Sequence, residues 1–288
     1  MTGRIVALNC GMYSVLADGI IYKVPARGSF RTKGIKPTVG DNVILDDDYL
    51  AIKEVLERHS YLKRPLIANA DQLLIIQSLK EPDFSYDLVF KYLTYANMNH
   101  LVPKIVVTKI DKESDKQKLN EIKEVFETLE IEIHFLSNFT KEGVDEISHL
   151  FAGKITCLIG QTGAGKSSTI NSIDPSFARI EGEYSKALGR GKHQTKEAVL
   201  LPYCGGFIAD TPGFSSLELE LYKEDAAIYF PGFYQRYTEC YYTDCLHISE
   251  PKCAIKKAID DVKIPKIAYE CYKRLSNELI FRNRRYEK

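Results

Sequence analysis

The chain lacks several sequence features that define particular classes of protein, and each absence excludes one class or argues against it. It has no run of about 18 apolar residues, which excludes a transmembrane helix. Its first residues, Met1 to Asn9, lack the hydrophobic segment of a signal peptide. It has no internal repeat, and its seven cysteines are an odd number, which argues against a disulfide framework. From these absences and the length of 288 residues we expect a cytoplasmic protein of two domains or three small ones, with no membrane partner.

The chain also has no net charge, but its charges are unevenly distributed. Residues 1–65 carry ten Lys and Arg against seven Asp and Glu, and residues 251–288 carry eleven against five. The segment between them is therefore acidic. Basic ends are typical of solvated surfaces and also of proteins that bind a polyanion. The charge pattern leaves both interpretations open.

A glycine-rich segment, 160–167, lies between an apolar run at 155–159 and the start of an expected helix at 166–173. This is the context of a phosphate-binding loop, because glycines let backbone N–H groups converge on phosphate oxygens at the positive end of a helix. The Lys166 ammonium would reach the β- and γ-phosphates, and the Ser167 hydroxyl would bind Mg²⁺. The predicted nucleotide-binding residues here are Gly160, Gln161, Thr162, Gly163, Ala164, Gly165, Lys166, Ser167 and Ser168.

A second motif, Thr108-Lys109-Ile110-Asp111, ends an expected strand at 104–108. It resembles the base-reading N/T-K-x-D element of GTPases. The Asp111 carboxylate can accept from guanine N1–H and the 2-amino group, which adenine does not offer, and the Lys109 stem can pack along the base. Ser137, at the end of the strand expected at 131–136, is in the place of the companion serine loop. The predicted base-binding residues are Thr108, Lys109, Ile110, Asp111 and Ser137.

A third motif, Asp210-Thr211-Pro212-Gly213, ends the expected strand 206–210. A strand-end aspartate beside a phosphate loop is the expected Mg²⁺-water ligand, and the Gly213 N–H can meet the γ-phosphate. Residues 185–196 are polar and rich in glycine and basic residues. A mobile loop there would act as a first switch, with Thr195 closing on Mg²⁺, although a plain flexible loop has the same composition. The predicted magnesium ligands are Ser167, Thr195 and Asp210.

The order of these motifs is unusual. Conventional GTPases begin with the phosphate loop, whereas here the base-reading element and the serine come first. The order is that of a circular permutation, which keeps the site and moves the chain ends. Because the third motif, Asp210-Thr211-Pro212-Gly213, is the second switch and then runs directly into the C-terminal segment, a movement driven by the γ-phosphate would shift whatever follows residue 213.

Cysteine and histidine cluster near the C-terminus, where Cys240, Cys245, His247 and Cys253 fall within 14 residues. Three thiolates and one imidazole fill a tetrahedral zinc site and leave no open position, so we predict one structural Zn²⁺. The alternative is a set of unrelated free cysteines and a surface histidine. Helices are expected at 254–260 and 267–285. The basic end of the second could contact RNA or simply be solvated.

The fold class follows from the pattern of elements. Residues 2–65 indicate five short strands, typical of a small oligonucleotide-binding (OB) barrel, with a basic loop carrying Phe30 that suits phosphate contacts and base stacking. After a linker at 63–65, strands and helices alternate, which predicts a mainly parallel sheet covered by helices. The predicted division is an OB-type barrel at 1–65, a circularly permuted GTPase domain at 66–218 and a zinc-binding helical domain at 219–288. The barrel strands are expected at 4–9, 13–17, 20–25, 42–45 and 49–56.

Barrel, permuted motifs and Cys₃His cluster, in that order, resemble the ribosome-small-subunit-dependent GTPase A family over nearly the whole chain. The resemblance implies a protein that binds GTP and GDP, contacts 16S rRNA on the 30S subunit, acts in late subunit maturation and is stimulated there. Nothing in the sequence suggests more than a monomer. Phe214 follows the third motif, where many GTPases have a water-orienting glutamine, so hydrolysis by the protein alone should be slow. The resemblance suggests that His193 acts on the water instead. The predicted catalytic residues are His193, Lys166, Thr195 and Asp210.

Two other functions stay open. The chain could be a P-loop ATPase or kinase that phosphorylates a small substrate, against which Asp111 argues. It could also be a non-catalytic RNA-binding module that holds nucleotide as a structural ligand. Lys166, Ser167 and Asp210 argue against that alternative because they are the groups that hydrolysis requires.

Overall fold

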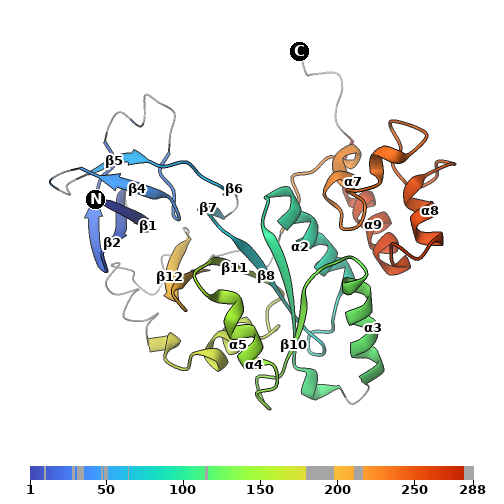
Figure 1. Cartoon of the computed structure of the whole chain (residues 1–288), viewed down its shortest axis with the longest axis horizontal. Helices are drawn as coiled ribbons and strands as arrows, with labels where there is room; N and C mark the ends of the chain where they lie inside the picture. Colours follow the sequence, from blue (N-terminus) through green and yellow to red (C-terminus); the bar gives the residue numbers. More distant parts are fainter. Residues whose placement is uncertain are drawn as a thin grey trace.

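The computed structural model describes residues 1–281 with gaps (Figure 1). It contains an N-terminal β-barrel, a central sheet flanked by helices, and a C-terminal group of helices beyond them. None of the helices within the described residues has the length and apolar character that a membrane span requires. The residues outside the description are 10, 28–29, 31–35, 47, 49–50, 64, 114–115, 180–197, 211–216 and 282–288.

The N-terminal sheet closes on itself. Its strand order is β3-β2-β1-β4-β5, and all neighbours are antiparallel. A parallel bridge between Ala26 and Ile52 joins the chain after β3 to β5, and so closes the sheet into a barrel. All five predicted strands are present, and the last is described over Ile52–Val55. The strands are β1 (Thr2–Asn9), β2 (Met12–Ala17), β3 (Ile20–Val24), β4 (Asn42–Leu45) and β5 (Ile52–Val55).

Two expectations for this region are wrong. Phe30 is only 6% exposed because it packs into the hydrophobic core, so its ring cannot stack on a base. Lys63, the first residue of the linker expected at 63–65, instead lies in a hairpin of β6 (Tyr61–Lys63) and β7 (Leu66–Ala68), where it pairs with Leu66. The hairpin packs tightly on the barrel: a Cβ on Gly40 would lie 1.9 Å from the carbonyl oxygen of Ala68.

The central sheet has the order β10-β9-β8-β11-β13-β12. The predicted strands run parallel, but β12 (Val199–Tyr203) was not predicted and pairs antiparallel with β13, so the sheet is mixed. A two-residue turn, Cys204-Gly205 with φ of 48° and 71°, makes that pairing possible. The parallel strands are β8 (Gln72–Ser78), β9 (Val102–Thr108), β10 (Ile133–Leu136), β11 (Ile155–Ile159) and β13 (Gly206–Asp210).

Helices cover both faces of this sheet. Right-handed crossovers place α2 and α3 on one face and α4 and α5 together on the other (Figure 1). A 3-10 turn at His149–Phe151 directly follows α4. The helices are α2 (Tyr86–Met98), α3 (Lys116–Glu127), α4 (Val144–Ser148) and α5 (Lys166–Ile173).

The C-terminal helices pack against α2. Phe90 on α2 stacks on Phe230, with ring centroids 5.3 Å apart, and Arg274 on α9 pairs with Asp87 at 2.8 Å. The prediction that the last helix continues to residue 285 is wrong. It ends at Glu278, because Ile280 forms a parallel bridge with Tyr222 instead of another helical turn. The elements are α7 (Ala226–Tyr229), α8 (Ala254–Asp260) and α9 (Lys266–Glu278).

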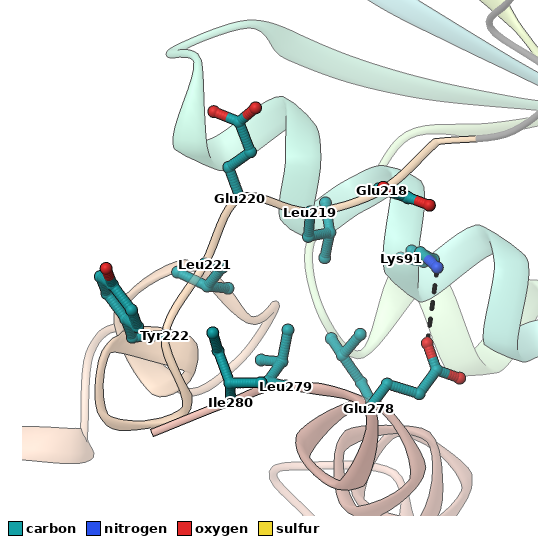
Figure 2. A pocket seen from close by; sticks show the side chains of 10 residues that line it. Lys91, Glu218, Leu219, Glu220, Leu221, Tyr222, Glu278, Leu279 and Ile280 are labelled. Atoms are coloured by element: carbon teal, nitrogen blue, oxygen red, sulfur yellow. Dashed lines mark hydrogen bonds and ion pairs between the residues drawn. The ribbon is translucent and has the colours of Figure 1, made fainter. Parts of the chain in front are cut away.

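The segments on either side of that bridge line a surface pocket (Figure 2). Leu219, Leu221 and Leu279 form its apolar part, and Lys91 on α2 pairs across it with Glu278 at 3.4 Å. The chain that follows β13 is thus attached to both α2 and the end of α9.

Candidate nucleotide site and metal centre

The loop from Gly160 to Gly165 requires its glycines. A Cβ on Gly160 would lie 2.0 Å from the carbonyl oxygen of Ile76 on the neighbouring β8. Gly163 and Gly165 have φ of 82° and 93°, a conformation that side chains disfavour. Gly165 is also the N-cap of α5, so the loop delivers backbone N–H groups to the positive end of that helix.

Lys166 lies folded over this loop. Its ammonium donates to the carbonyls of Gly160 and Gln161 at 2.6 and 2.8 Å. Burial lowers the pKa of Lys166 from its ordinary value. A bound phosphate would offer this half-buried ammonium a charged partner in place of two neutral carbonyls.

Two of the three predicted magnesium ligands share one cavity with this lysine. Lys166, Ser167 and Asp210 line a space of about 170 Å³ between α5 and β13. Hydroxyl and carboxylate oxygens are the donors that Mg²⁺ prefers. The donor set present therefore fits a magnesium ion bound with a nucleotide.

The base-reading residues lie at the neighbouring strand ends. Asp111 is in a 3-10 turn, η1 (Ile110–Lys112), and Ser137 donates to its Oδ1 at 2.6 Å. Thr108 donates to the carbonyl of Ala164 at 2.6 Å, which connects this part to the phosphate loop. The Ile110 side chain is buried in the core, so only its backbone could reach a ligand.

The structure does not describe every predicted site residue. His193, Thr195, Gly213 and Phe214 lie outside the described residues. Thr162 and Ser168 are exposed on the loop and on the first turn of α5, and Ala164 is buried.

One neighbour of the site was missed from the sequence. The carbonyl of Glu81, in the loop after β8, accepts from the Lys109 ammonium, and the Glu81 carboxylate pairs with Lys112. The signal that could have found it is topological, because loops after adjacent parallel strands converge at one edge of a sheet.

The Cys₃His cluster has the dimensions of a zinc site. Cys240 Sγ lies 3.9 Å from Cys253 Sγ, and both lie 3.4 to 3.5 Å from His247 Nδ1. Bonds of about 2.3 Å to sulfur and about 2.0 Å to nitrogen in a tetrahedron separate ligand atoms by roughly 3.5 to 3.8 Å. Cys245 completes the set, and the four ligand atoms lie within 4.8 Å of one another. The residues present fit one zinc ion.

The loop around these ligands is held by surrounding groups. The Glu250 carboxylate accepts from the N–H groups of Leu246, Ile248 and Ser249 at 2.9 to 3.1 Å. Tyr269 on α9 donates to the carbonyl of His247 at 2.9 Å. Burial lowers the pKa of His247 to about 4, which keeps the imidazole in the neutral form that binds metal.

Phosphate loop, strand-end aspartate and serine loop therefore converge at the carboxyl edge of one α/β sheet, in permuted chain order. Fold and site together define a circularly permuted P-loop GTPase joined to a barrel and a metal-binding helical part. The chain belongs to the RsgA GTPase family. The model of that family, "RsgA GTPase", matches residues 51–220, and the model "RsgA N-terminal domain" matches residues 2–49.

Individual relatives match the sequence of this chain over nearly its whole length. The "Small ribosomal subunit biogenesis GTPase RsgA" of Geobacillus sp. (strain WCH70) is 38% identical over 290 residues, which is 99% of each chain. The protein of that name from Clostridium botulinum (strain Eklund 17B / Type B) is 35% identical, over 97% of this chain and 98% of its own.

Solved structures agree with the fold. The crystal structure of YjeQ from Thermotoga maritima has a TM-score of 0.83 and 31% identity, and covers 98% of this chain and 99% of its own. The crystal structure of YloQ, described as a circularly permuted GTPase, has a TM-score of 0.79 and 30% identity, covering 96% and 94%. The predicted family and fold class are confirmed, and none of these findings supports an ATPase or kinase.

Proposed function

We propose that this protein is a GTPase of small ribosomal subunit biogenesis, which binds the 30S subunit and hydrolyses GTP slowly alone and faster on the subunit. The observation that carries the proposal is the contact between Ser137 and Asp111 beside the phosphate loop. It holds a carboxylate at the base-reading position of a permuted GTPase. The names of the relatives supply the biological process.

The described residues of the site have separate roles in nucleotide binding. Asp111 selects guanine, because a carboxylate has enough acceptor capacity to bind Ser137 and two base N–H groups at once. Lys166 binds the phosphates, while Ser167 and Asp210 hold the magnesium ion. Magnesium, when bound, neutralises charge that develops on the transferring phosphoryl group. His193, Thr195 and Gly213 keep the roles that the sequence suggests, as water-activating, magnesium-binding and γ-phosphate-binding residues.

The two ends of the chain would hold the protein on 16S rRNA. With Phe30 buried, the barrel loop can contribute only its cations, of which Arg27 and Lys36 are described. Zinc would crosslink the loop that carries its four ligands, beside the buried rings of Phe233 and Tyr272. We retain the three-part division with its second boundary at 218/219, and place the first boundary after the hairpin of β6 and β7, which packs on the barrel. We also retain a monomeric state and a cytoplasmic location, where the small subunit is assembled.

The test measures GTP and ATP hydrolysis with and without purified 30S subunits, with Lys166→Ala as the inactive control. We expect the subunit to raise the turnover of GTP but not of ATP, and we expect the Lys166→Ala variant to lose the GTP turnover. Turnover that is indifferent to the subunit, for either nucleotide, would refute the proposal. Asp111→Asn adds a test of base selection: its amide offers a donor where guanine also has one, so preference for guanine over xanthine nucleotides should fall.

A further inference from the structure

The chain between β13 and α7 contains an extended segment, residues 217–221, that lies beside α2. Its sequence is Leu-Glu-Leu-Glu-Leu, and this alternation with a period of two is typical of a strand with one buried and one solvated face. The burial agrees with the pattern, because the three leucines are half-buried or buried and the two glutamates are exposed. In the described part of the chain, however, these five residues belong to none of the sheets.

The backbone of this segment is open to pairing. The parallel bridge between Tyr222 and Ile280 lies just beyond its end, and the chain before Ile280 comes from helix α9, so the pairing does not continue along the segment. Among the described residues, the N–H and C=O groups of Leu217, Glu218 and Leu219 make no hydrogen bond. Unpaired groups on an extended backbone are those to which a further strand can be added.

The segment also forms one side of the surface pocket described above, which has a volume of about 750 Å³. Figure 2 shows Leu221 directed toward Leu279 and the Glu220 carboxylate directed away from both. Three carboxylates and one ammonium line the pocket, and the ammonium, on Lys91, is paired with Glu278 at 3.4 Å. The pocket therefore combines apolar surface with net negative charge.

This charge indicates the chemistry of a partner. Carboxylates repel phosphates, which argues against RNA at this place although both ends of the chain are basic. A second copy of the same segment would bring glutamates opposite glutamates, which is destabilising across a strand pair. An extended segment with cations at alternate positions would instead place them opposite Glu218 and Glu220, and would leave its other side chains for the apolar surface around Leu219.

We propose that residues 217–221 bind, by strand addition, an extended protein segment in which basic and apolar residues alternate. Main-chain hydrogen bonds give the affinity, while the glutamates and the pocket select the side chains. The inference rests on the proposed function only in expecting this segment on a protein of the small subunit. A partner bound here contacts the chain that joins β13 to the C-terminal helices.

Fluorescence anisotropy with a labelled peptide of four Lys-Val repeats tests the proposal. The full-length protein should bind it more tightly than a peptide of four lysines followed by four valines, because only alternation puts the cations on one face of a strand. Glu218→Lys should raise the dissociation constant of the alternating peptide roughly 3- to 30-fold, since it replaces an attraction across the strand pair with a repulsion.

Glu54→Lys is the matched control, because it makes the same change of charge at an exposed glutamate on β5 of the barrel. It should bind the alternating peptide like the wild type. Equal affinity for the two peptides, or an affinity of Glu218→Lys within twofold of that of Glu54→Lys, overturns the proposal.

Methylated peptides test the strand pairing itself. Alternate residues of a strand turn their N–H groups to the same edge, so N-methylation of the lysines blocks one edge of the peptide and N-methylation of the valines blocks the other. One methylated peptide should lose binding and the other should retain it. Equal affinities of the two methylated peptides overturn strand addition.

The basic end of the chain, with Arg282, Arg284 and Arg285 in its sequence, is the other candidate occupant. If the alternating peptide bound only to a chain that ends at Phe281, the site would belong to the chain's own end, and the proposal of an outside partner would be overturned.

Hydrolysis measurements separate this proposal from the function it rests on. Glu218 is outside the nucleotide site, so Glu218→Lys should keep the GTP turnover of the wild type in the absence of 30S subunits. A wild type that binds the alternating peptide but shows no stimulation by the subunit would refute only the GTPase proposal. A wild type that is stimulated but does not bind the peptide refutes only the docking site.

Discussion

The hydroxyl of Thr108 donates a hydrogen bond to the carbonyl of Ala164 at 2.6 Å, across 56 residues of sequence. Both residues are fully buried. The bond joins the end of β9, which carries the proposed base-reading residues, to the proposed phosphate loop. The two parts of the candidate nucleotide site are therefore connected directly by a buried hydrogen bond.

Thr108→Val tests this connection. Valine keeps the shape of threonine but leaves the Ala164 carbonyl buried without its donor, at a cost of about 1–3 kcal/mol. We expect a lower melting temperature together with weaker GDP binding. Thr94→Val on α2 is the control, since it also removes a buried hydroxyl, which donates to the Phe90 carbonyl at 2.8 Å, but away from the site. It should lower stability only. Unchanged GDP affinity in Thr108→Val would contradict the connection.

Gly160→Ala should abolish nucleotide binding. The new Cβ would lie 2.0 Å from the Ile76 carbonyl oxygen, a backbone atom that cannot move aside without shifting β8. Gly153→Ala provides a matched comparison, because Gly153 also has a positive φ, 69°, but nothing lies within 4 Å of its added Cβ. That variant should carry only the backbone strain, about 1–3 kcal/mol, and bind GDP normally. Calorimetric titration with GDP measures the affinity of both variants. Equal GDP affinity in Gly160→Ala and Gly153→Ala would show that nucleotide binding does not need the close approach of Gly160 to the Ile76 carbonyl.

GDP affinity should fall in alkaline buffer earlier than an ordinary lysine would predict. Burial lowers the pKa of Lys166 below 10.5 in the free protein, and phosphate binding requires the charged ammonium. Affinity should be flat below the lowered pKa and decrease as pH rises through it. Titrations of GDP across the alkaline range measure this. Guanosine, which has no phosphates but carries the same titrating N1–H of the base, is the reference, and a decline for GDP no steeper than that for guanosine would assign the effect to the base.

The same lysine has the opposite effect on folding. Between its lowered folded-state pKa and 10.5, the unfolded chain binds more protons than the folded one. The contribution of Lys166 to the free energy of unfolding of the nucleotide-free protein therefore rises with pH in that window. Denaturant titrations of the wild type and Lys166→Met measure this: within that window the free energy of unfolding should rise with pH more steeply for the wild type than for Lys166→Met, and equal pH dependence would contradict the assignment.

Zinc should be present at one ion per chain and be lost with its ligands. Cys253→Ser removes a thiolate from the cluster, and we expect the zinc content to fall to near zero and the region around α8 and α9 to lose its fixed packing. Elemental analysis and near-ultraviolet circular dichroism measure these two effects. Cys204→Ser is the control, because Cys204 is an exposed thiol outside the cluster. Full zinc content in Cys253→Ser would show that the cluster is not the metal site.

Local signals were sufficient for much of this structure. The hairpin turn at Asp18-Gly19 is present, with φ of 48° and 78°, because that dipeptide tolerates the left-handed conformation. The strand before the phosphate loop and the helix after it were predictable for the same reason. Elements held by distant partners were not: β12 forms by pairing with β13, and α9 ends where Ile280 meets Tyr222.

The sequence by itself determined the chemistry of the protein, because that chemistry depends on residue types at short spacing. Glycines and a lysine within eight residues specify a phosphate loop, and three cysteines and a histidine within 14 residues specify a metal centre. Only the tertiary structure decided how the parts become one site. Asp111 and Ser137, 26 residues apart, meet because β9 and β10 are neighbours in a parallel sheet, whose strand ends share one edge. It also decided that Phe30 is buried and Phe139 exposed, since burial depends on the whole fold.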